Sequence, residues 1–417
     1  MSTLNEILPL RRQAEARDGW LKARLDALLP ELMGREKLDM WIVACREYNE
    51  DPVIMSLLPA TSMSARRRTI LLFARQADGS VERLTVSRYG YEGFYDAVWN
   101  PDNEEQHDCL ARLVRERDPE RIGINISRTF AFGDGISHTE HQLLSEALGE
   151  PYAARLVSAE GLCVGWLERR LPEEIAAYPR LVELGHQIIA RAFSSEVIHP
   201  GITTTDDVVW WMRQTMQAHG VSAWFQPTVD VQSPDSAFEF IESPCVTIQR
   251  GDLLHCDMGF HYLGLATDQQ QHAYVLKAGE TDAPAGIRAA LQEGNRLQDI
   301  LMDDMRVGRS GNEVLRRALK RAEAEGIRAQ IYTHPLGYHG HAAGPLIGLW
   351  DRQDSVPGAG EYHLFDDTVY SIELNIVKSV PEWAGRDARI MLEEDAALSG
   401  GEMRWLAGRQ TALHIIP

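Results

Sequence analysis

The stretch DMGFHYLGLATD, residues 257–268, carries an aspartate at each end of a mostly apolar run. On one straight strand, a separation of eleven residues would put Asp257 and Asp268 on opposite faces. A hairpin removes this difficulty, because Gly264 can take the positive φ of a tight turn. We therefore expect the chain to fold back near Tyr262–Gly264. The two aspartates then lie roughly opposite each other, where cross-strand Cβ atoms are about 5 Å apart.

A second pair of carboxylates follows in a similar arrangement. Glu373 lies in the apolar run TVYSIELNIV and Glu393 in ARIMLEEDAAL, with a loop near Trp383 between them. Four carboxylates gathered in a mostly apolar sheet repel one another and raise each other's pKa values. Their ionised forms persist only where cations neutralise them. The two pairs therefore indicate a site for divalent metal.

The segment THPLGYHGHAAGP, residues 333–345, offers nitrogen ligands in His334, His339 and His341. We expect at least one of them to bind metal. Four oxygens and one imidazole form a harder ligand set than typical zinc sites use, which favours Mn²⁺, Co²⁺ or Fe²⁺ over Zn²⁺. Two such ions about 3.5–4 Å apart activate a water and polarise a carbonyl group. This is the chemistry of amide hydrolysis.

Each of these residues has a simpler explanation when it is taken alone. A single acid in a strand is usually solvated, and a single histidine is usually a packed or surface group. Glu393, Glu394 and Asp395 together are also consistent with an exposed acidic strand end. Two hairpin pairs with a histidine cluster between them are much less expected by chance, so we favour the joint metal site.

The order of these motifs resembles that of the pita-bread metallopeptidases, which include methionine aminopeptidase, aminopeptidase P, prolidase and creatinase. The matching segments are DMGFHYLGLATD, GHAAG, SIELNI and RIMLEEDAAL. The resemblance implies an α+β protein with a C-terminal pita-bread fold (creatinase/aminopeptidase-like) and a smaller N-terminal α/β domain. It covers residues 170–417 strongly and the N-terminal half weakly.

The resemblance also implies roles for the carboxylates. Asp257 resembles a terminal metal ligand, whereas Asp268 and Glu393 resemble bridging ligands. Glu373 resembles the ligand that also serves as acid and base. Glu393 is preferred to Glu394 because prolidase-like members place the ligand first in the Glu-Glu-Asp run. The implied cofactor is a pair of divalent metal ions, with Mn favoured and Co, Fe or Zn as alternatives.

Among the histidines, His341 fits the family's ligand position, since Gly340 precedes it and Gly344 follows three residues later. With this alignment, other histidines of the family are absent from three places: seven residues after the ligand (Gly348), four before it (Gly337), and upstream in residues 225–244. His334 or His339 is then expected to replace a lost catalytic group. A histidine beside Gly and Pro in a loop also has a purely structural explanation.

The whole chain fits this organisation. Its 417 residues exceed the size of a single core, so we expect domains at 1–168 and 169–417. Helices alternate with strands in the first, and helices precede strands in the second. The net charge of −19 argues against nucleic-acid partners and anionic membranes. The five scattered cysteines and the charged N-terminal segment favour the cytoplasm, and no run reaches the ~18 apolar residues of a membrane span.

These features predict a metal-dependent hydrolase, most simply an Xaa-Pro aminopeptidase or a prolidase-like dipeptidase. Its partner is a small peptide or amide substrate, and the resemblance implies a homodimer. One alternative is hydrolysis of another C–N bond in a small metabolite, which the altered histidines allow. Another is a catalytically silent pita-bread binding module, although such modules tend to lose ligands that this chain keeps. Creatinase lacks most of the metal ligands, so their retention argues against a metal-free mechanism.

Overall fold

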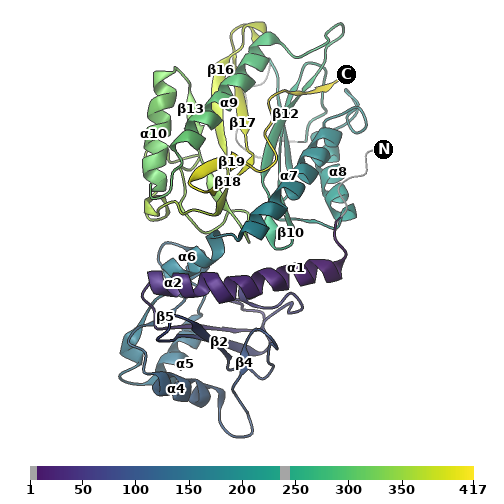
Figure 1. The fold of residues 1–417 in the computed structure, drawn as a ribbon. Coiled ribbons are helices and arrows are strands. Elements are labelled where there is room, and N and C mark those ends of the chain that lie inside the picture. Colours follow the sequence, from purple (N-terminus) through teal and green to yellow (C-terminus); the bar gives the residue numbers. More distant parts are fainter. Residues whose placement is uncertain (1–6, 235–244) are drawn as a thin grey trace. The chain divides into compact units, whose positions relative to one another are not determined.

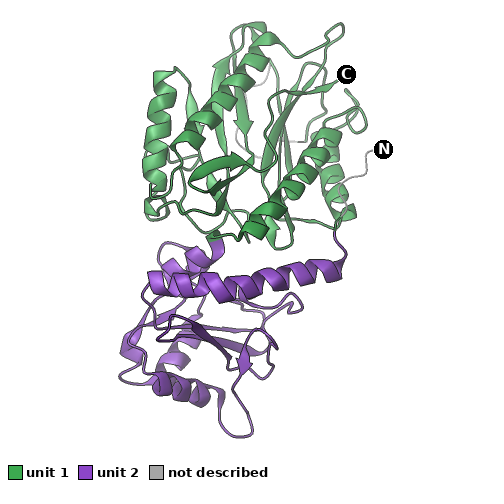
Figure 2. Cartoon of the chain, viewed as in Figure 1, with its two compact units in different colours: residues 1–7, 168–417 green, residues 8–167 purple. Residues whose placement is uncertain are grey.

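The computed structural model describes residues 7–234 and 245–417, which form two compact units (Figures 1 and 2). The smaller unit spans Leu8–Leu167, and the larger contains Ile7 and the described residues between Glu168 and Pro417. The break lies beside residue 168, where the sequence predicts a domain boundary. Helices and sheets are both abundant, which confirms the predicted α+β class. No helix in the described ranges is both long and apolar enough to cross a bilayer.

The smaller unit is built on a six-stranded mixed sheet with the order β4-β3-β2-β1-β5-β6. Its strands are β1 (Met40–Arg46), β2 (Arg68–Arg75), β3 (Val81–Thr85), β4 (Asp96–Ala97), β5 (Ile122–Ile124) and β6 (Leu156–Ser158). Its helices are α1 (Leu10–Ala23), α2 (Leu29–Arg35), α3 (Ile54–Leu57), α4 (Gln106–Arg117), α5 (His138–Leu148) and α6 (Glu160–Glu168). Side chains of α4 and α5 join those of β1 and β2 in one apolar core.

In the larger unit, the described residues form four sheets, with the orders β11-β10-β7, β20-β12-β9-β8, β13-β16-β17 and β14-β15-β18-β19. The strands up to β12 are β7 (Ser222–Ala223), β8 (Thr228–Gln232), β9 (Leu253–Met258), β10 (Phe260–Tyr262), β11 (Leu265–Ala266) and β12 (Gln269–Val275). The later strands are β13 (Ala329–Ile331), β14 (His334–Leu336), β15 (Thr368–Ser371), β16 (Leu374–Ser379), β17 (Asp387–Leu392), β18 (Asp395–Ser399), β19 (Glu402–Trp405) and β20 (His414–Ile416).

The helices of the larger unit are α7 (Pro172–Ala192), α8 (Thr205–Ala218), α9 (Ala285–Asp304) and α10 (Gly311–Ala324). Helix α9 packs on β16 and β17 (Figure 1). It approaches closely at Gly294, where an added Cβ would lie 2.9 Å from Cδ1 of Leu392. The glycine thus allows the helix to rest directly on the strand that leads to Glu393.

In three places, two consecutive strands that belong to different sheets are separated by only two residues. The breaks separate β13 from β14, β15 from β16, and β17 from β18. Glu373 and Glu393 lie within two of the breaks, and His334 begins the strand after the third. At such breaks a side chain is not confined to the alternating faces of a regular strand.

The predicted hairpin between Asp257 and Asp268 is confirmed, with positive φ at Leu263 (56°) and Gly264 (78°). The register differs in one detail, because Gln270 and not Asp268 pairs with Asp257. The tight turn sets this register by pairing Tyr262 with Leu265. Asp268 lies two residues nearer the turn than Gln270, so it still shares a face with Asp257.

The second predicted hairpin is confirmed as well. Strands β16 and β17 pair from Leu374↔Leu392 to Ser379↔Asp387, and the connecting turn contains Trp383. Glu373 and Glu393 are the next residues beyond this ladder. They therefore emerge together at its open end.

The packing of β17 against α9 can be tested with Ile390, which is fully buried and pairs with Ile376. We expect Ile390→Ala to lower the free energy of unfolding by about 2–5 kcal/mol, because it leaves a cavity in the core. Ile202, which is 77% exposed, provides the matched control. Ile202→Ala should change stability by no more than about 0.5 kcal/mol in the same urea titration. Equal stability of the two variants would contradict this account of the core.

Candidate metal centre

The two hairpins and the histidine segment bring their polar side chains into one cluster. Three sets of side chains offer ligand atoms that lie within 4.8 Å of one another: Asp257, Asp268 and Glu393; His334, Glu373 and Glu393; and Asp268, His334 and His341. The first two sets share Glu393. They form adjoining groups of three ligands with one carboxylate in common.

Backbone contacts at the strand breaks hold this cluster together. Gln270 N donates to Glu393 O (2.9 Å), which ties the first hairpin to the second. The Thr333 hydroxyl accepts from Glu373 N and donates to Glu373 O, both at 2.9 Å. Tyr332 N also donates to Glu373 O (3.2 Å), so both backbone groups of Glu373 are satisfied at the break.

The carboxylates of the cluster lie close to one another, with Asp268 and Glu393 buried and Asp257 and Glu373 half-buried. Asp268 is 3% exposed and Glu393 is 1% exposed. Burial, and next the charge of Glu393, raise the pKa values of Asp257, Asp268 and Glu373 well above their ordinary range. Burial also raises the pKa of Asp395, whose Oδ1 accepts from Asp268 N (3.2 Å). Ionising this group of acids together requires nearby positive charge.

His334 faces the carboxylates from β14 and is buried. Its Nδ1 lies 3.0 Å from the Pro335 carbonyl oxygen and donates to it, which turns Nε2 towards the acids. Nε2 lies 3.3 Å from Glu393 Oε1, 3.6 Å from Asp268 Oδ2 and 3.8 Å from Glu373 Oε2. This is the ring orientation of a metal-binding histidine.

Buried atoms without hydrogen-bond partners test whether this cluster fits metal. Among the described residues, Asp257 Oδ1, Asp268 Oδ1 and His334 Nε2 are buried and have no such partner. Buried polar atoms are almost always paired, so three unpaired ones in one cluster require an explanation. Carboxylate oxygens and a neutral imidazole nitrogen are ligands for divalent metal, and the cluster therefore fits the group.

His341 lies beside this cluster but differs from His334 in its surroundings. It is exposed, and its ring packs edge-on against His334 (4.7 Å between ring centroids) and Trp224 (5.1 Å). Burial of its ring atoms and the nearby His334 lower its pKa, which favours the neutral form. In the ligand sets, Glu373 and Glu393 group with His334 and not with His341.

His339 lies apart from the ligand sets and from the described lining of the adjacent cavity. Burial, and next His261, lower its pKa to about 4. The sequence contains a signal that distinguishes His334 from His341. Gly337 follows His334 by three residues and His341 follows it by seven, which is the family's spacing of ligand and second histidine. The Gly340-His341 pair is the competing signal, and it favours His341 as the ligand in the sequence.

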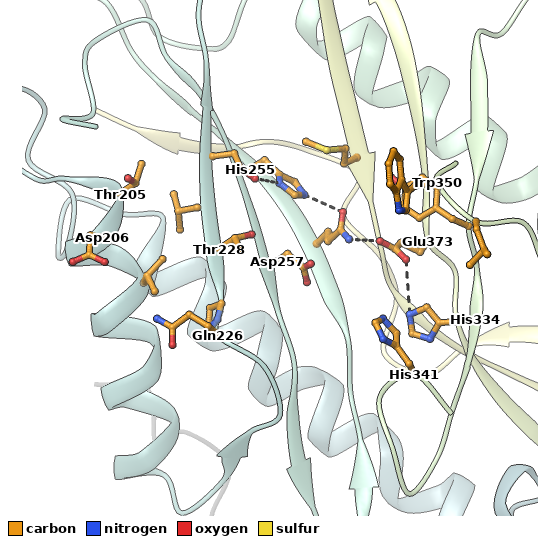
Figure 3. Close-up of a pocket in the computed structure, with 18 of the residues that line it drawn as sticks. Thr205, Asp206, Gln226, Thr228, His255, Asp257, His334, His341, Trp350 and Glu373 are labelled. Carbon is orange, nitrogen blue, oxygen red and sulfur yellow. Dashed lines mark hydrogen bonds and ion pairs between the residues drawn. The ribbon is translucent and has the colours of Figure 1, made fainter. Parts of the chain in front are cut away.

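A cavity of about 850 Å³ opens over the cluster, and Asp257, Glu373, His334 and His341 converge at its wall (Figure 3). Asp206, from the first turn of α8, and Asp230, from β8, also line it. Its apolar wall consists of Tyr332, Leu346, Leu349, Trp350 and Met391 together with smaller residues. No Lys or Arg is among the described residues that line the cavity.

Sequence reasoning missed His255 and Gln270, which also line the cavity. Strand alternation gives a signal for both, because His255 precedes Asp257 by two residues and Gln270 follows Asp268 by two. The upstream segment in which we noted no catalytic histidine, residues 225–244, is described as far as residue 234. Residues 235–244 lie outside the described part of the chain.

Comparison with known proteins agrees with this architecture. The X-Pro aminopeptidase from Thermotoga maritima superimposes with a TM-score of 0.66 at 16% identity, covering 91% of this chain and 98% of that chain. An Xaa-Pro dipeptidase from Bacillus anthracis gives 0.62 at 15% identity, with coverage of 98% and 100%. Prolidase from Pyrococcus furiosus gives 0.60 at 16% identity, with coverage of 91% and 99%. At these low sequence identities, the superpositions show a common fold.

A search of curated protein sequences finds no match to this chain. The model of metallopeptidase family M24, however, matches residues 180–399, which is more than half of the 417 residues. The chain therefore belongs to metallopeptidase family M24, the pita-bread metallopeptidases.

Proposed function

We propose that this metallopeptidase uses two divalent metal ions to hydrolyse peptides at Xaa-Pro bonds, as an aminopeptidase. The observation that carries the proposal is the pair of adjoining ligand sets that share Glu393 at the wall of a cavity. The names of the structural neighbours, which include an X-Pro aminopeptidase and a prolidase, support the bond preference. Retention of the whole ligand set favours an enzyme over a silent binding module.

In this proposal one ion is held by Asp257, Asp268 and Glu393, and the other by His334, Glu373 and Glu393. His334 takes the ligand role that the sequence suggested for His341, because its Nε2 faces three carboxylates and its Nδ1 is fixed by Pro335. The oxygen-rich set favours Mn, with Co, Fe or Zn as alternatives. When bound, such ions polarise a carbonyl group and lower the pKa of water.

The remaining chemistry falls to side chains at the cavity wall. Glu373 is partly exposed, so it can accept a proton from the attacking water and return it to the leaving nitrogen. His341 is exposed beside His334, where its N–H can donate to the carbonyl oxygen as negative charge develops there. A catalytic role for His339 stays a prediction.

The charges of the cavity favour the aminopeptidase alternative over the dipeptidase. Asp206 and Asp230 line it, and the described lining contains no Lys or Arg. A free amino group is attracted by such a wall, whereas the terminal carboxylate of a dipeptide is repelled. Tyr332, Leu349 and Trp350 offer apolar surface for a proline ring. A cytoplasmic location and a homodimer stay predictions from the sequence.

The two histidines provide the first test, because they differ in role and lie seven residues apart. Reconstituted wild type should bind about two Mn²⁺ per chain, measured by elemental analysis. His334→Ala should lose metal, since it removes a ligand. His341→Ala should keep its metal and lose kcat by roughly 10²–10³-fold, as expected for one transition-state donor. Metal loss in His341→Ala with metal retained in His334→Ala would restore the original assignment.

The second test concerns the substrate. Mn-loaded protein should cleave a tripeptide Xaa-Pro-Yaa with a free amino end, and N-acetylation should abolish cleavage because it removes the charge that the acidic wall attracts. Amidation of the C-terminus should leave cleavage intact. Peptides without proline are the control for bond preference. A clear preference for the Xaa-Pro dipeptide over the amidated tripeptide would instead identify a dipeptidase.

The third test uses pH. The folded-state pKa values of Asp257, Asp268 and Glu373 are raised, so the folded protein binds protons more tightly than the unfolded chain. These three groups contribute fully to the stability of the folded protein below their unfolded-state pKa values of about 4. That contribution is lost as pH rises through their folded-state pKa values. The Tm of metal-free protein should therefore fall as pH rises. The increase in Tm on adding Mn²⁺ should become larger as pH rises. Glu373→Gln should weaken the pH dependence of the metal-free Tm and that of the Mn²⁺-induced increase. A metal-free Tm that rises with pH would contradict the cluster's electrostatics.

A further inference from the structure

A chain of polar contacts runs from the cavity wall to Glu373 and Glu393, and Figure 3 shows the part that reaches Glu373. Asp230 Oδ2 lies 3.2 Å from His255 Nδ1, and His255 Nε2 lies 3.0 Å from Gln270 Oε1. Gln270 Nε2 then donates to Glu373 Oε1 (2.6 Å) and Glu393 Oε2 (2.9 Å). His255 and Gln270 are both 4% exposed, so water does not compete for these contacts.

The orientation of the Gln270 amide follows from its partners. Its nitrogen carries two hydrogens, and the two carboxylates accept one each. Its oxygen then faces His255, whose Nε2 donates to it. The reversed amide would place an oxygen against two carboxylates, which is strongly unfavourable in a buried site. Asp230 Oδ2 lies on the opposite side of the His255 ring, where it accepts a hydrogen bond from Nδ1 when both ring nitrogens carry a proton.

This amide meets carboxylates that otherwise have few fixed contacts. Glu393 accepts from the Ser371 hydroxyl at Oε1 and from Gln270 at Oε2. Glu373 accepts from Gln270 at Oε1, while its Oε2 faces His334. The backbones of Gln270 and Glu393 also form an antiparallel bridge, which fixes the position of the amide relative to the Glu393 carboxylate.

We propose that Gln270 is a positioning residue, whose amide holds Glu373 and Glu393 in the orientation that binds metal and transfers the proton, and that the His255–Asp230 pair holds this amide. The inference rests on the proposed metal site. A neutral donor suits this role because it fixes two acids and leaves their charge for the metal. Partners of this kind orient metal ligands in many sites, and their loss weakens metal binding.

The next residue of β12 offers a matched control. Gln271 is also 4% exposed, and its Nε2 donates to Glu394 Oε1 (2.7 Å), while its Oε1 lies 2.7 Å from His414 Nε2. The His-Gln-Glu contacts are the same in kind. Strand alternation, however, places Gln271 on the face opposite Gln270 and outside the ligand sets.

The experiment measures Mn²⁺ affinity by isothermal titration calorimetry, together with kcat and KM. Gln270→Leu should weaken Mn²⁺ binding by about 10–100-fold and lower kcat more than it changes KM. Gln271→Leu should retain wild-type affinity and kcat. His255→Leu should reproduce part of the loss, whereas His255→Gln, which keeps a donor, should recover it. These His255 variants touch neither carboxylate, so they test the inference even if Gln270→Leu does not fold.

The outcomes separate this inference from the proposed function. Wild type that binds no Mn²⁺ overturns the metal site itself. Wild type that binds Mn²⁺, with Gln270→Leu and His255→Leu equal to it in affinity and kcat, overturns only the positioning role. Equal losses in Gln270→Leu and Gln271→Leu also overturn it, because they point to general damage to the sheet.

Discussion

Repulsion among buried carboxylates is the constraint on which the larger unit depends. Asp257, Asp268, Glu373 and Glu393 are brought within reach of one another by two separate hairpins. Taking several charges out of water together is costly unless opposite charge accompanies them. A packed sheet can carry such a cluster when the acids bind either protons or cations. Bound metal would relieve the same repulsion that makes the buried acids costly.

The fold places these acids by interrupting its strands. Regular strands alternate their side chains between two faces, so they cannot direct ligands from several strands to one point without local breaks. Breaks around Glu373 and Glu393 let each long strand serve two sheets. The Thr333 hydroxyl satisfies the backbone of Glu373 at its break, so the interruption leaves no unpaired backbone group there. Helix α9 supports β16 and β17 from behind, which keeps the open end of that hairpin in place.

Much of the site was predictable because hairpins leave local signals. Gly264 and the apolar alternation indicate the first hairpin, and the loop around Trp383 indicates the second. The exact register was not predictable, since it depends on a positive φ at Leu263, a residue type that rarely adopts one. Choosing between His334 and His341 was harder, because both have a glycine three residues later. The two rings differ in the folded chain, where His334 Nε2 lies 3.3 Å from Glu393 Oε1 and 3.6 Å from Asp268 Oδ2.

Gln270 shows what a local reading of the sequence leaves out. A glutamine carries no charge and matches no ligand pattern, and the only mark of Gln270 in the sequence is its position two residues after Asp268. Its significance arises from the junction of two hairpins, where its backbone pairs with Glu393 and its amide reaches Glu373. A Lys or Arg at this position would also hold the acids, but its positive charge would compete with the metal for them. A neutral amide avoids that competition, which explains why the structure has an amide at the point where the two hairpins meet.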